Sequence, residues 1–497
     1  MLLNSALITT SMLVACGGDS GAEGMQGSMD VAAASMASVG VDEFSTDDDL
    51  TDGQLTSESI EEKWRRWRWE RLSWPSAPAP APSAPAPAPS APAPAPSAPA
   101  PAPSAPAPAP SAPAPAPSGS YPSEQRISGQ PSDRIGAAPG YLTAISFPDL
   151  GTSVMRITDP STMGSGNRRH AYSKRQPWNA DSSRLLLAYK SPYQMLDGRT
   201  FRSLGTTSAP GDPIWSNVDP DLIYGVSGNS FVKFRPSTNS TISRRQFSQY
   251  SRIRIGGGEG NQSDNDRYVA LVGERSGGVD VFVYDISNDV VVSTAKFDGF
   301  TGPYGDIDSA GVSPSGRYVL VGITRPNKNY DLYDLQTMTF LRRLVSNQLS
   351  HGDMGYTAEG DEALVTSADG QSALKSIRLS DGRKRVELSS AHMAWNQHVS
   401  CQNKARPGWC YVSTFYHSAK TDAYMYRQIF ALKLDGSGTV QRFAPATFAD
   451  NPSGDKYTRE HHAVPNRNGT LVLFASDWRN ASSSATVHTY VAGTRLP

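Results

Sequence analysis

The segment VSPSGRYVLVGI, from Val312 to Ile323, shows the pattern on which the fold of this chain depends. A Ser-Pro-Ser-Gly turn is followed by a run rich in β-branched and aromatic residues, which is typical of a strand that leaves a tight turn. Six more segments repeat this pattern, and they begin at Asn179, Asn217, Gln262, Tyr356, Asn403 and Pro465. Successive copies lie about 40 to 60 residues apart, which indicates a repeated structural unit.

Most copies are followed by a second pair of β-prone runs, as in VDVFVYDISNDVVVSTAKF. Four short strands per repeat at this period are typical of a β-propeller. Seven copies therefore predict an all-β, seven-bladed propeller, with its blades between about Ala144 and Ala492 of a domain covering residues 121–497. The segment Leu150 to Pro160 precedes the first copy, and we expect it to complete the last blade. A β-sandwich is the alternative, but seven turns in the same phase argue against it.

The N-terminus predicts export. Its apolar stretch is too short to span a bilayer but has the length of a signal-peptide core. It ends in Leu13-Val14-Ala15-Cys16, which resembles the lipobox of bacterial lipoproteins. The resemblance implies a signal peptide over residues 1–15, a lipid on Cys16, and a place at the outer membrane or cell surface. An ordinary secretory signal with a chance cysteine is the alternative.

Two segments of biased composition follow. Residues 16–75 are acidic and lack periodicity, so we expect a disordered tail that includes the Trp/Arg-rich stretch EEKWRRWRWERLSWP. Residues 76–120 consist mainly of SAPAPAP repeats. Because proline fixes φ and removes backbone donors, this linker is expected to be an extended polyproline II spacer. At about 3.1 Å per residue it would reach roughly 130 Å.

The formal net charge of −1 argues against nucleic acid as a main partner, because phosphate binding needs a basic face. We expect a monomer whose partners are a glycan and, through the lipid, a membrane.

The segments just before the innermost strands are expected to converge at one mouth of the propeller. They contain five of the eight histidines of the chain. Imidazole suits acid–base chemistry near neutral pH and metal ligation, so this bias predicts a site at that mouth. The polar residues in these segments are His170, Asp212, Glu259, Tyr304, Asp306, His351, Asp353, His398, Arg459, Glu460, His461 and His462.

Cys401 and Cys410 flank the turn KARPG and should lie on adjacent antiparallel strands. In an exported protein this favours a disulfide. The alternative is a structural zinc held by both cysteines together with His351 and His398. No other cofactor is predicted.

A propeller with HAYSKRQPWNAD opening its first blade and EHHAVPNRNGTLVLFASDW closing its last resembles the oligogalacturonate lyases and ulvan lyases. These families cleave uronic-acid polysaccharides by β-elimination, which needs a neutralised carboxylate, a base and an acid. The resemblance implies catalytic roles for His170, Tyr172, Tyr304, Arg459, His461 and His462. The expected substrate-binding residues are Lys174, Trp178, Trp215, Glu259 and Trp395.

Three functions remain open from the sequence. The first is a tethered lyase that acts on an acidic polysaccharide. The second is a non-catalytic propeller that binds a glycan or the cell wall, for which the three tryptophans would be stacking residues. The third is a protein-interaction propeller of the cell envelope, which would have an apolar rim.

Overall fold

The computed structural model describes residues 120–125, 135–164, 168–301, 305–367, 373–390, 397–414, 425, 427–447, 456–480, 482 and 484–497. The predicted signal peptide, acidic tail and spacer, with Cys16, lie outside the described residues, as do Tyr304 and Trp395. No helix in the described ranges is long and apolar enough to cross a membrane.

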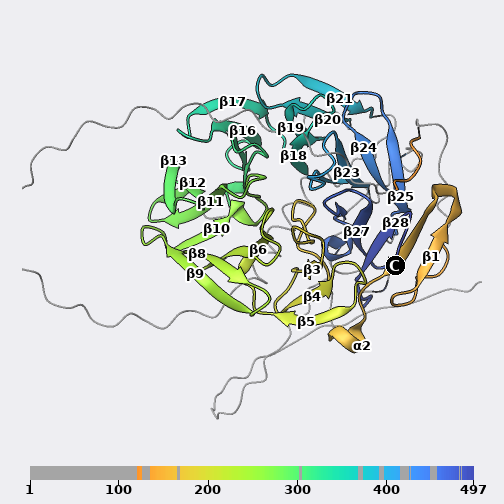
Figure 1. Cartoon of the computed structure of the whole chain (residues 1–497). Helices are drawn as coiled ribbons and strands as arrows, with labels where there is room; N and C mark the ends of the chain where they lie inside the picture. Colours follow the sequence, from red (N-terminus) through yellow and green to blue (C-terminus); the bar gives the residue numbers. More distant parts are fainter. Residues whose placement is uncertain are drawn as a thin grey trace, which may run out of the picture. The chain divides into compact units, whose positions relative to one another are not determined.

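Seven sheets follow one another around a central axis, as the prediction required (Figure 1). The first contains β3 (Arg184–Leu187), β4 (Tyr193–Asp197) and β5 (Ser203–Thr207). The second contains β6 (Gly211–Trp215), β7 (Ile223–Ser227), β8 (Ser230–Arg235) and β9 (Ser240–Gln246). The third contains β10 (Arg252–Ile255), β11 (Tyr268–Arg275), β12 (Gly278–Asp285) and β13 (Val290–Asp298).

The fourth blade contains β14 (Ile307–Val312), β15 (Tyr318–Ile323), β16 (Asn329–Asp334) and β17 (Phe340–Val345). The fifth contains β18 (Gly352–Tyr356), β19 (Glu362–Thr366), β20 (Leu374–Arg378) and β21 (Lys384–Leu388). The sixth contains β22 (Gln397–Ser400), β23 (Trp409–Thr414), β24 (Gln428–Lys433) and β25 (Val440–Pro445). The helical turns are α2 (Pro160–Met163), α3 (Lys456–Arg459), η1 (Pro148–Leu150) and η2 (Gly256–Gly258).

The seventh blade closes the ring with both ends of the domain. Its strands lie in the order β1 (Ala144–Phe147), β2 (Thr152–Arg156), β28 (His488–Gly493), β27 (Leu471–Ser476) and β26 (Val464–Pro465). The predicted closing strand is therefore confirmed, since β2 pairs antiparallel with β28. Two blades depart from four strands. The seventh gains β1 as a fifth strand, and the first keeps a single bridge between Trp178 and Leu185 in place of an innermost strand.

The hydrophobic core lies between neighbouring blades. All eight residues of β12 are buried, whereas all seven of β9, an outermost strand, are exposed. Neighbouring blades thus cover both faces of the inner strands, and for this reason the sequences of these strands are nearly continuous apolar runs. In the interface between the third and fourth blades, Val281 of β12 and Val319 of β15 belong to one buried cluster. Burying one such side chain contributes roughly 1.5 to 3 kcal/mol, so these interfaces hold the blades together.

The two ends of the axis differ. We call the end at which the innermost strands begin the entry face, and the end that carries the turns between the first and second strands of each blade the turn face. At the turn face, Lys404 of the sixth blade forms an ion pair with Asp264 of the third. Arg467 of the seventh blade donates to the carbonyl oxygens of Asn179 at 2.9 Å and Ser216 at 3.1 Å. These contacts cross the axis and tie the blades together at the turn face.

Candidate functional site

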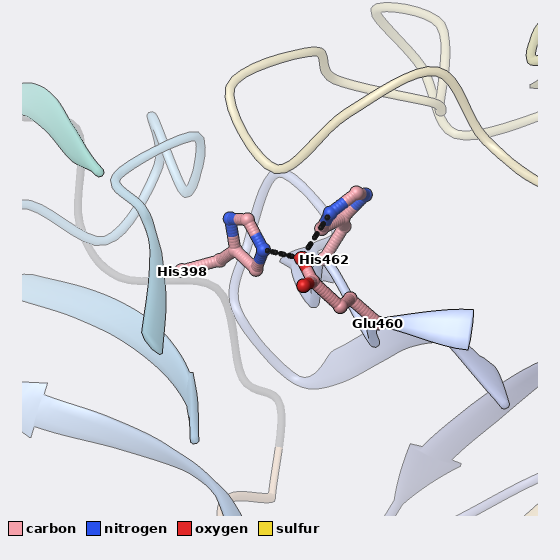
Figure 2. A group of neighbouring side chains, drawn as sticks. All are labelled: His398, Glu460 and His462. Carbon is pink, nitrogen blue, oxygen red and sulfur yellow. Dashed lines mark hydrogen bonds and ion pairs between the residues drawn. The ribbon is translucent and has the colours of Figure 1, made fainter. Parts of the chain in front are cut away.

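Two histidines and a glutamate from the last two blades meet at the entry face (Figure 2). His398 is the second residue of β22, and Glu460 and His462 precede β26. Oε2 of Glu460 lies 2.8 Å from Nε2 of His398 and 3.3 Å from Nε2 of His462. All three side chains are buried. The carboxylate therefore accepts a hydrogen bond from each imidazole when the ring hydrogens are on Nε2.

Tyr172 and His351 extend this group. The Tyr172 hydroxyl lies 2.7 Å from Nδ1 of His351. The His351 ring centroid is 4.1 Å from that of His398, and the Tyr172 ring lies 5.0 Å from the His462 ring. His351 is half-buried, whereas Tyr172 is 3% exposed. We call these five residues the axial cluster, and His351 is its member with the most contact to solvent.

Arg169 and His170 join the first blade to the last. The Arg169 guanidinium donates to the Thr458 carbonyl and to Nδ1 of His462. Nε2 of His170 donates to the His462 carbonyl at 2.5 Å. The first blade thus holds the ring of His462 through Arg169 and its backbone through His170.

The imidazoles of His398 and His462 are neutral at physiological pH. Burial, with neighbouring histidines and Arg169, lowers the pKa of His398 and of His462 well below 6.5. Burial and Arg169 likewise lower the pKa of His170 to about 3. Neutral rings keep a nitrogen lone pair, which is the form that binds metals and accepts protons.

A small polar cavity of about 40 Å³ lies beside the cluster along the axis. Lys174 and Glu259 line it and form an ion pair at 3.1 Å. Burial alone would lower the pKa of Lys174, but Glu259, Tyr330, Asp308 and Asp353 together outweigh burial and raise it. Burial raises the pKa of Asp353, another lining residue, against the hydrogen bonds that its carboxylate accepts. A cavity of this size has room for water.

The donor set of the cluster fits a divalent metal. One atom each from His398, Glu460 and His462 lie within 4.8 Å of one another, and the residues are buried. Two neutral imidazoles with one carboxylate form a common ligand set for catalytic zinc and related metals. Ligation through Nε2 moves the ring hydrogen to Nδ1, so the Arg169 donor on His462 must then turn aside.

Arg459 and His461 form contacts within the last blade. Arg459 forms an ion pair with Asp477 at 3.1 Å and donates to the carbonyl oxygens of Asn480 and Ser482. Its guanidinium is therefore bound to the chain after β27, and these contacts do not join it to His170 or His462. The His461 ring packs against Phe474 at 5.9 Å inside the last blade.

The tryptophans expected at the mouth are core residues in the structure. Trp178 is 0% exposed and donates from Nε1 to the Gly198 carbonyl, while Trp215 is 2% exposed and donates to the Pro177 carbonyl. A fully covered indole cannot stack on a sugar ring, so this part of the prediction is wrong. Trp395 and Tyr304 fall outside the described residues.

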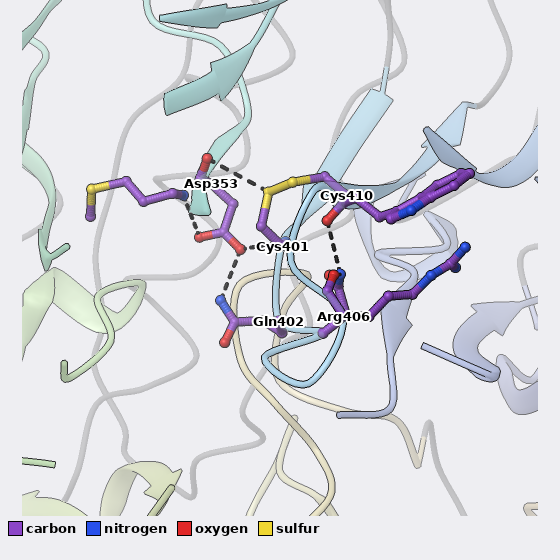
Figure 3. Close-up of a disulfide and its surroundings, with 8 residues drawn as sticks. Asp353, Cys401, Gln402, Arg406 and Cys410 are labelled. Atoms are coloured by element: carbon purple, nitrogen blue, oxygen red, sulfur yellow. Dashed lines mark hydrogen bonds between the residues drawn. A yellow bond between two sulfur atoms is a disulfide. The ribbon is translucent and has the colours of Figure 1, made fainter. Parts of the chain in front are cut away.

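The cysteines form a disulfide, which overturns the alternative of a cysteine-ligated zinc (Figure 3). Cys401 follows β22 and Cys410 lies in β23, with their Cα atoms 4.4 Å apart. The Cys401 amide and the Gln402 side chain each donate at 2.8 Å to the Asp353 carboxylate. The disulfide thus lies next to a residue of the axial cavity, and His398 finds its partner in Glu460 instead.

Sequence reasoning missed Arg169, and for His398 it expected a place at the mouth but, in the zinc alternative, the wrong partners. Arg169 stood beside His170 in the pair Arg168-Arg169, but nothing in that pattern shows which arginine points inward. His398 was grouped with the cysteines three residues away because local spacing was visible and the contact with Glu460, 62 residues later, was not.

No family model matches this chain, and no curated protein matches it. Similar solved structures include an oligogalacturonate lyase from Vibrio parahaemolyticus, with 12% identity, a TM-score of 0.49, and coverage of 75% of this chain and 98% of that one. Hydrazine synthase from Kuenenia stuttgartiensis has 12% identity, a TM-score of 0.39, and coverage of 67% and 98%. The β-propeller domain of Myceliophteria thermophila Cps50 (Swd1) has 11% identity, a TM-score of 0.38, and coverage of 66% and 98%. These likenesses concern the fold alone.

Proposed function

We propose that this protein is an exported polysaccharide lyase that cleaves a uronic-acid polymer by β-elimination at the axial cluster. The observation that supports it most directly is the Tyr172–His351 pair, joined at 2.7 Å beside the buried group formed by His398, Glu460 and His462. An acid and a base in contact are what the reaction needs, and the buried group offers a place for a cation.

His351 has the role of the base. In the tautomer with hydrogen on Nδ1, its ring donates to the Tyr172 oxygen, and Nε2 carries the lone pair that takes the proton from C5 of the uronate. The C5–H electron pair then forms the C4–C5 double bond, and the bond from C4 to the glycosidic oxygen breaks.

Tyr172 has the role of the acid. Its hydroxyl proton passes to the departing glycosidic oxygen, while the Nδ1 proton of His351 passes to the tyrosine oxygen. The sum of these transfers moves one proton from C5 to the leaving group. His351 ends neutral in its other tautomer, so the pair is ready for another cycle after one exchange of ring hydrogens with solvent.

The carboxylate of the substrate must be neutralised as the C5 proton leaves. His398, Glu460 and His462 would hold a divalent metal, and that ion would supply the positive charge. Their buried positions fix the ligand geometry, and Tyr172 packs against the His462 ring at 5.0 Å, which keeps the acid beside the ligands.

Absorbance near 235 nm, which reports the unsaturated uronate, tests the activity on a panel of uronic-acid polymers. We expect His351→Ala to lower kcat by about 100-fold to 10,000-fold, the usual contribution of an acid–base group, and to leave the metal content unchanged. Tyr172→Phe is expected to lower kcat in the same range, while His398→Ala should lose both the metal and the activity.

His488→Gln is the matched control. His488 contacts Arg156 and Thr158 in the last blade, at 3.4 and 3.3 Å, and is not part of the axial cluster. It should retain full activity and metal content. If the wild-type chain binds the polymers but releases no unsaturated product, the protein is a glycan-binding propeller and the lyase proposal is wrong.

The lipid on Cys16 and the location at the outer membrane or cell surface belong to the same proposal. They are supported by the lipobox-like Leu13-Val14-Ala15-Cys16 sequence. Mass spectrometry of the N-terminal peptide from the envelope fraction should show a diacylglyceryl group on Cys16. An N-terminal peptide that begins at another residue, or one in which Cys16 is unmodified, would contradict the proposed lipid anchor.

A further inference from the structure

The start of the described chain is attached to the turn face at several points. The Ser120 hydroxyl lies 2.7 Å from the Thr494 hydroxyl, and Gln125 forms a bridge with Val440. Thr494 follows β28 and Val440 begins β25, and both strand ends lie at the turn face because neighbouring strands alternate in direction.

Tyr121 makes the most specific of these contacts. Its ring centroid lies 3.8 Å from Cζ of Arg406, whose other side faces the Trp409 ring at 4.0 Å. A guanidinium between two aromatic rings combines cation–π attraction with planar stacking. The Tyr121 hydroxyl also donates to the Asn468 carbonyl at 3.1 Å.

Arg406 is itself fixed, so Tyr121 rests on a rigid support. The Arg406 guanidinium donates to the Tyr411 hydroxyl at 2.8 Å and to Oε1 of Gln441 at 2.6 Å. Arg406 lies in the turn after β22 (labelled in Figure 3), and Asn468 lies in the turn after β26. Both turns belong to the turn face.

The axial cluster lies at the opposite end of the same strands. His398 is the second residue of β22, whose far end leads into the turn of Arg406. His462 precedes β26, whose far end leads into the turn of Asn468. The strand direction therefore separates the attachment of the N-terminal chain from the cluster by the thickness of the ring.

We propose that Tyr121, held between Arg406 and Asn468, fixes the exit of the N-terminal chain to the turn face, so that the axial cluster points away from the surface to which that chain is tethered. The predicted stiff spacer ends at Pro117, three residues before the first anchored one, so it would transmit this orientation to the domain. Substrate then reaches the entry face without meeting the tether. This inference rests on the lipid anchor proposed above, but it does not depend on which reaction the cluster performs.

Distances between spin labels on the full chain test it. Cys16→Ser leaves the introduced cysteines as the labelled ones, because Cys401 and Cys410 are bonded to each other. One label at Ser111→Cys reports the spacer. The second is placed either at Ser276→Cys, in the β11–β12 hairpin at the entry face, or at Ser287→Cys, in the β12–β13 hairpin at the turn face. Both positions are exposed.

These two positions are a matched pair, because they flank the same strand, the eight-residue β12. At about 3.3 Å per residue, they lie roughly 25 Å apart along the axis. We expect the distance from Ser111→Cys to be shorter to Ser287→Cys than to Ser276→Cys, with a narrow distribution. Equal distances, or a shorter distance to Ser276→Cys, would overturn the proposal.

Two variants test the role of Tyr121 itself. Tyr121→Phe keeps the ring on Arg406 and should keep the narrow distribution. Tyr121→Ser removes the ring and should broaden the distribution several-fold in width while leaving the melting temperature of the propeller unchanged. A distribution that stays narrow in Tyr121→Ser would show that another contact fixes the exit, and the proposed role of Tyr121 would be wrong.

Discussion

At the scale of single residues, the histidines of this protein differ by their surroundings rather than by their sequence context. His461 and His462 are adjacent, yet one packs against Phe474 inside a blade and the other faces Glu460. The side chains of neighbouring residues near a strand point in opposite directions. A shift of one residue along the chain would therefore exchange the imidazole that faces the axis for the one that faces the blade. The adjacent histidines in the sequence predicted a site at the mouth of the propeller, but they did not predict which of the two would belong to it.

The buried histidines make folding stability depend on pH. Burial, with nearby arginines, lowers the pKa of His170 and of His461 to about 3. In the unfolded chain each imidazole takes up a proton below about pH 6.5, while the folded form stays neutral. Stability is therefore fully present above pH 6.5 and falls as the pH drops toward 3, by up to about 1.4 kcal/mol per pH unit for each group.

Urea unfolding between pH 7.5 and 5 measures this slope. His461→Leu, which keeps an apolar contact with Phe474, should flatten the slope below pH 6.5 by the contribution of one group. Wild-type behaviour at pH 7.5 serves as the internal reference, since neither form is protonated there. A slope that is the same in both proteins would show that His461 is not held neutral by the fold.

The arginines show where residue-scale prediction reached its limit. Arg459 was expected to have a catalytic role, and its guanidinium is paired with Asp477. Arg169 takes the place beside His462. Arg459 precedes the innermost strand of the last blade, and Arg169 precedes the Trp178 bridge that takes the place of this strand in the first, so both have the same position in the repeat. Arg169 finds its partner 293 residues away, and such a contact leaves no local pattern, whereas Asp477 lies only 18 residues after Arg459.

At the scale of elements, the turns and strands were the most predictable features. Each of the seven turns is followed by the strand that its sequence indicated, and the strand at residues 152–156 closes the ring as expected. The first and last blades were less predictable. The fifth strand β1 and the single bridge at Trp178 depend on how the ring closes, and closure is a property of the whole domain.

The disulfide is a brace between two strands of the sixth blade. Its closed loop is short, with a sequence separation of 9, so the loop-entropy model gives a stabilisation of about 2 to 3 kcal/mol. Replacing both cysteines by serine should lower the stability of the domain by about that amount. It should also loosen the Asp353 carboxylate, because the Cys401 amide is one of its donors.

Denaturant unfolding of Cys401→Ser/Cys410→Ser measures the loss, and reduced wild type provides the control that keeps both side chains in place. Hydrogen exchange at the Cys401 amide should rise in both. If stability is lost but that exchange is unchanged, the brace does not extend to Asp353.

At the scale of the whole molecule, the propeller domain should be independent of the chain before it. A variant that begins at Ser120 retains every described contact and should melt at the temperature of the full chain. A variant that begins at Pro160 lacks β1 and β2, so β28 keeps only its pairing with β27 and the buried Val154 is lost from the core of the last blade.

Calorimetry should therefore show the full melting transition for the first variant and a marked loss for the second. The loss is expected to exceed about 3 kcal/mol, since deleting a single large buried side chain already costs 2 to 5 kcal/mol. If the variant that begins at Pro160 melts like the full chain, the ring does not depend on its N-terminal strand.

The closure of the ring by β2 and β28 also sets an order of assembly. The hydrogen bond between His170 and His462 spans 292 residues, so the two halves of the cluster cannot meet until the last blade has been synthesised. Earlier blades can pack on their neighbours as they appear, but contacts at such sequence separation form late and slowly. A ribosome-bound or truncated chain would therefore carry an incomplete cluster. If the protein is exported as proposed, it is inactive until β28 has paired with β2 and the cluster is complete.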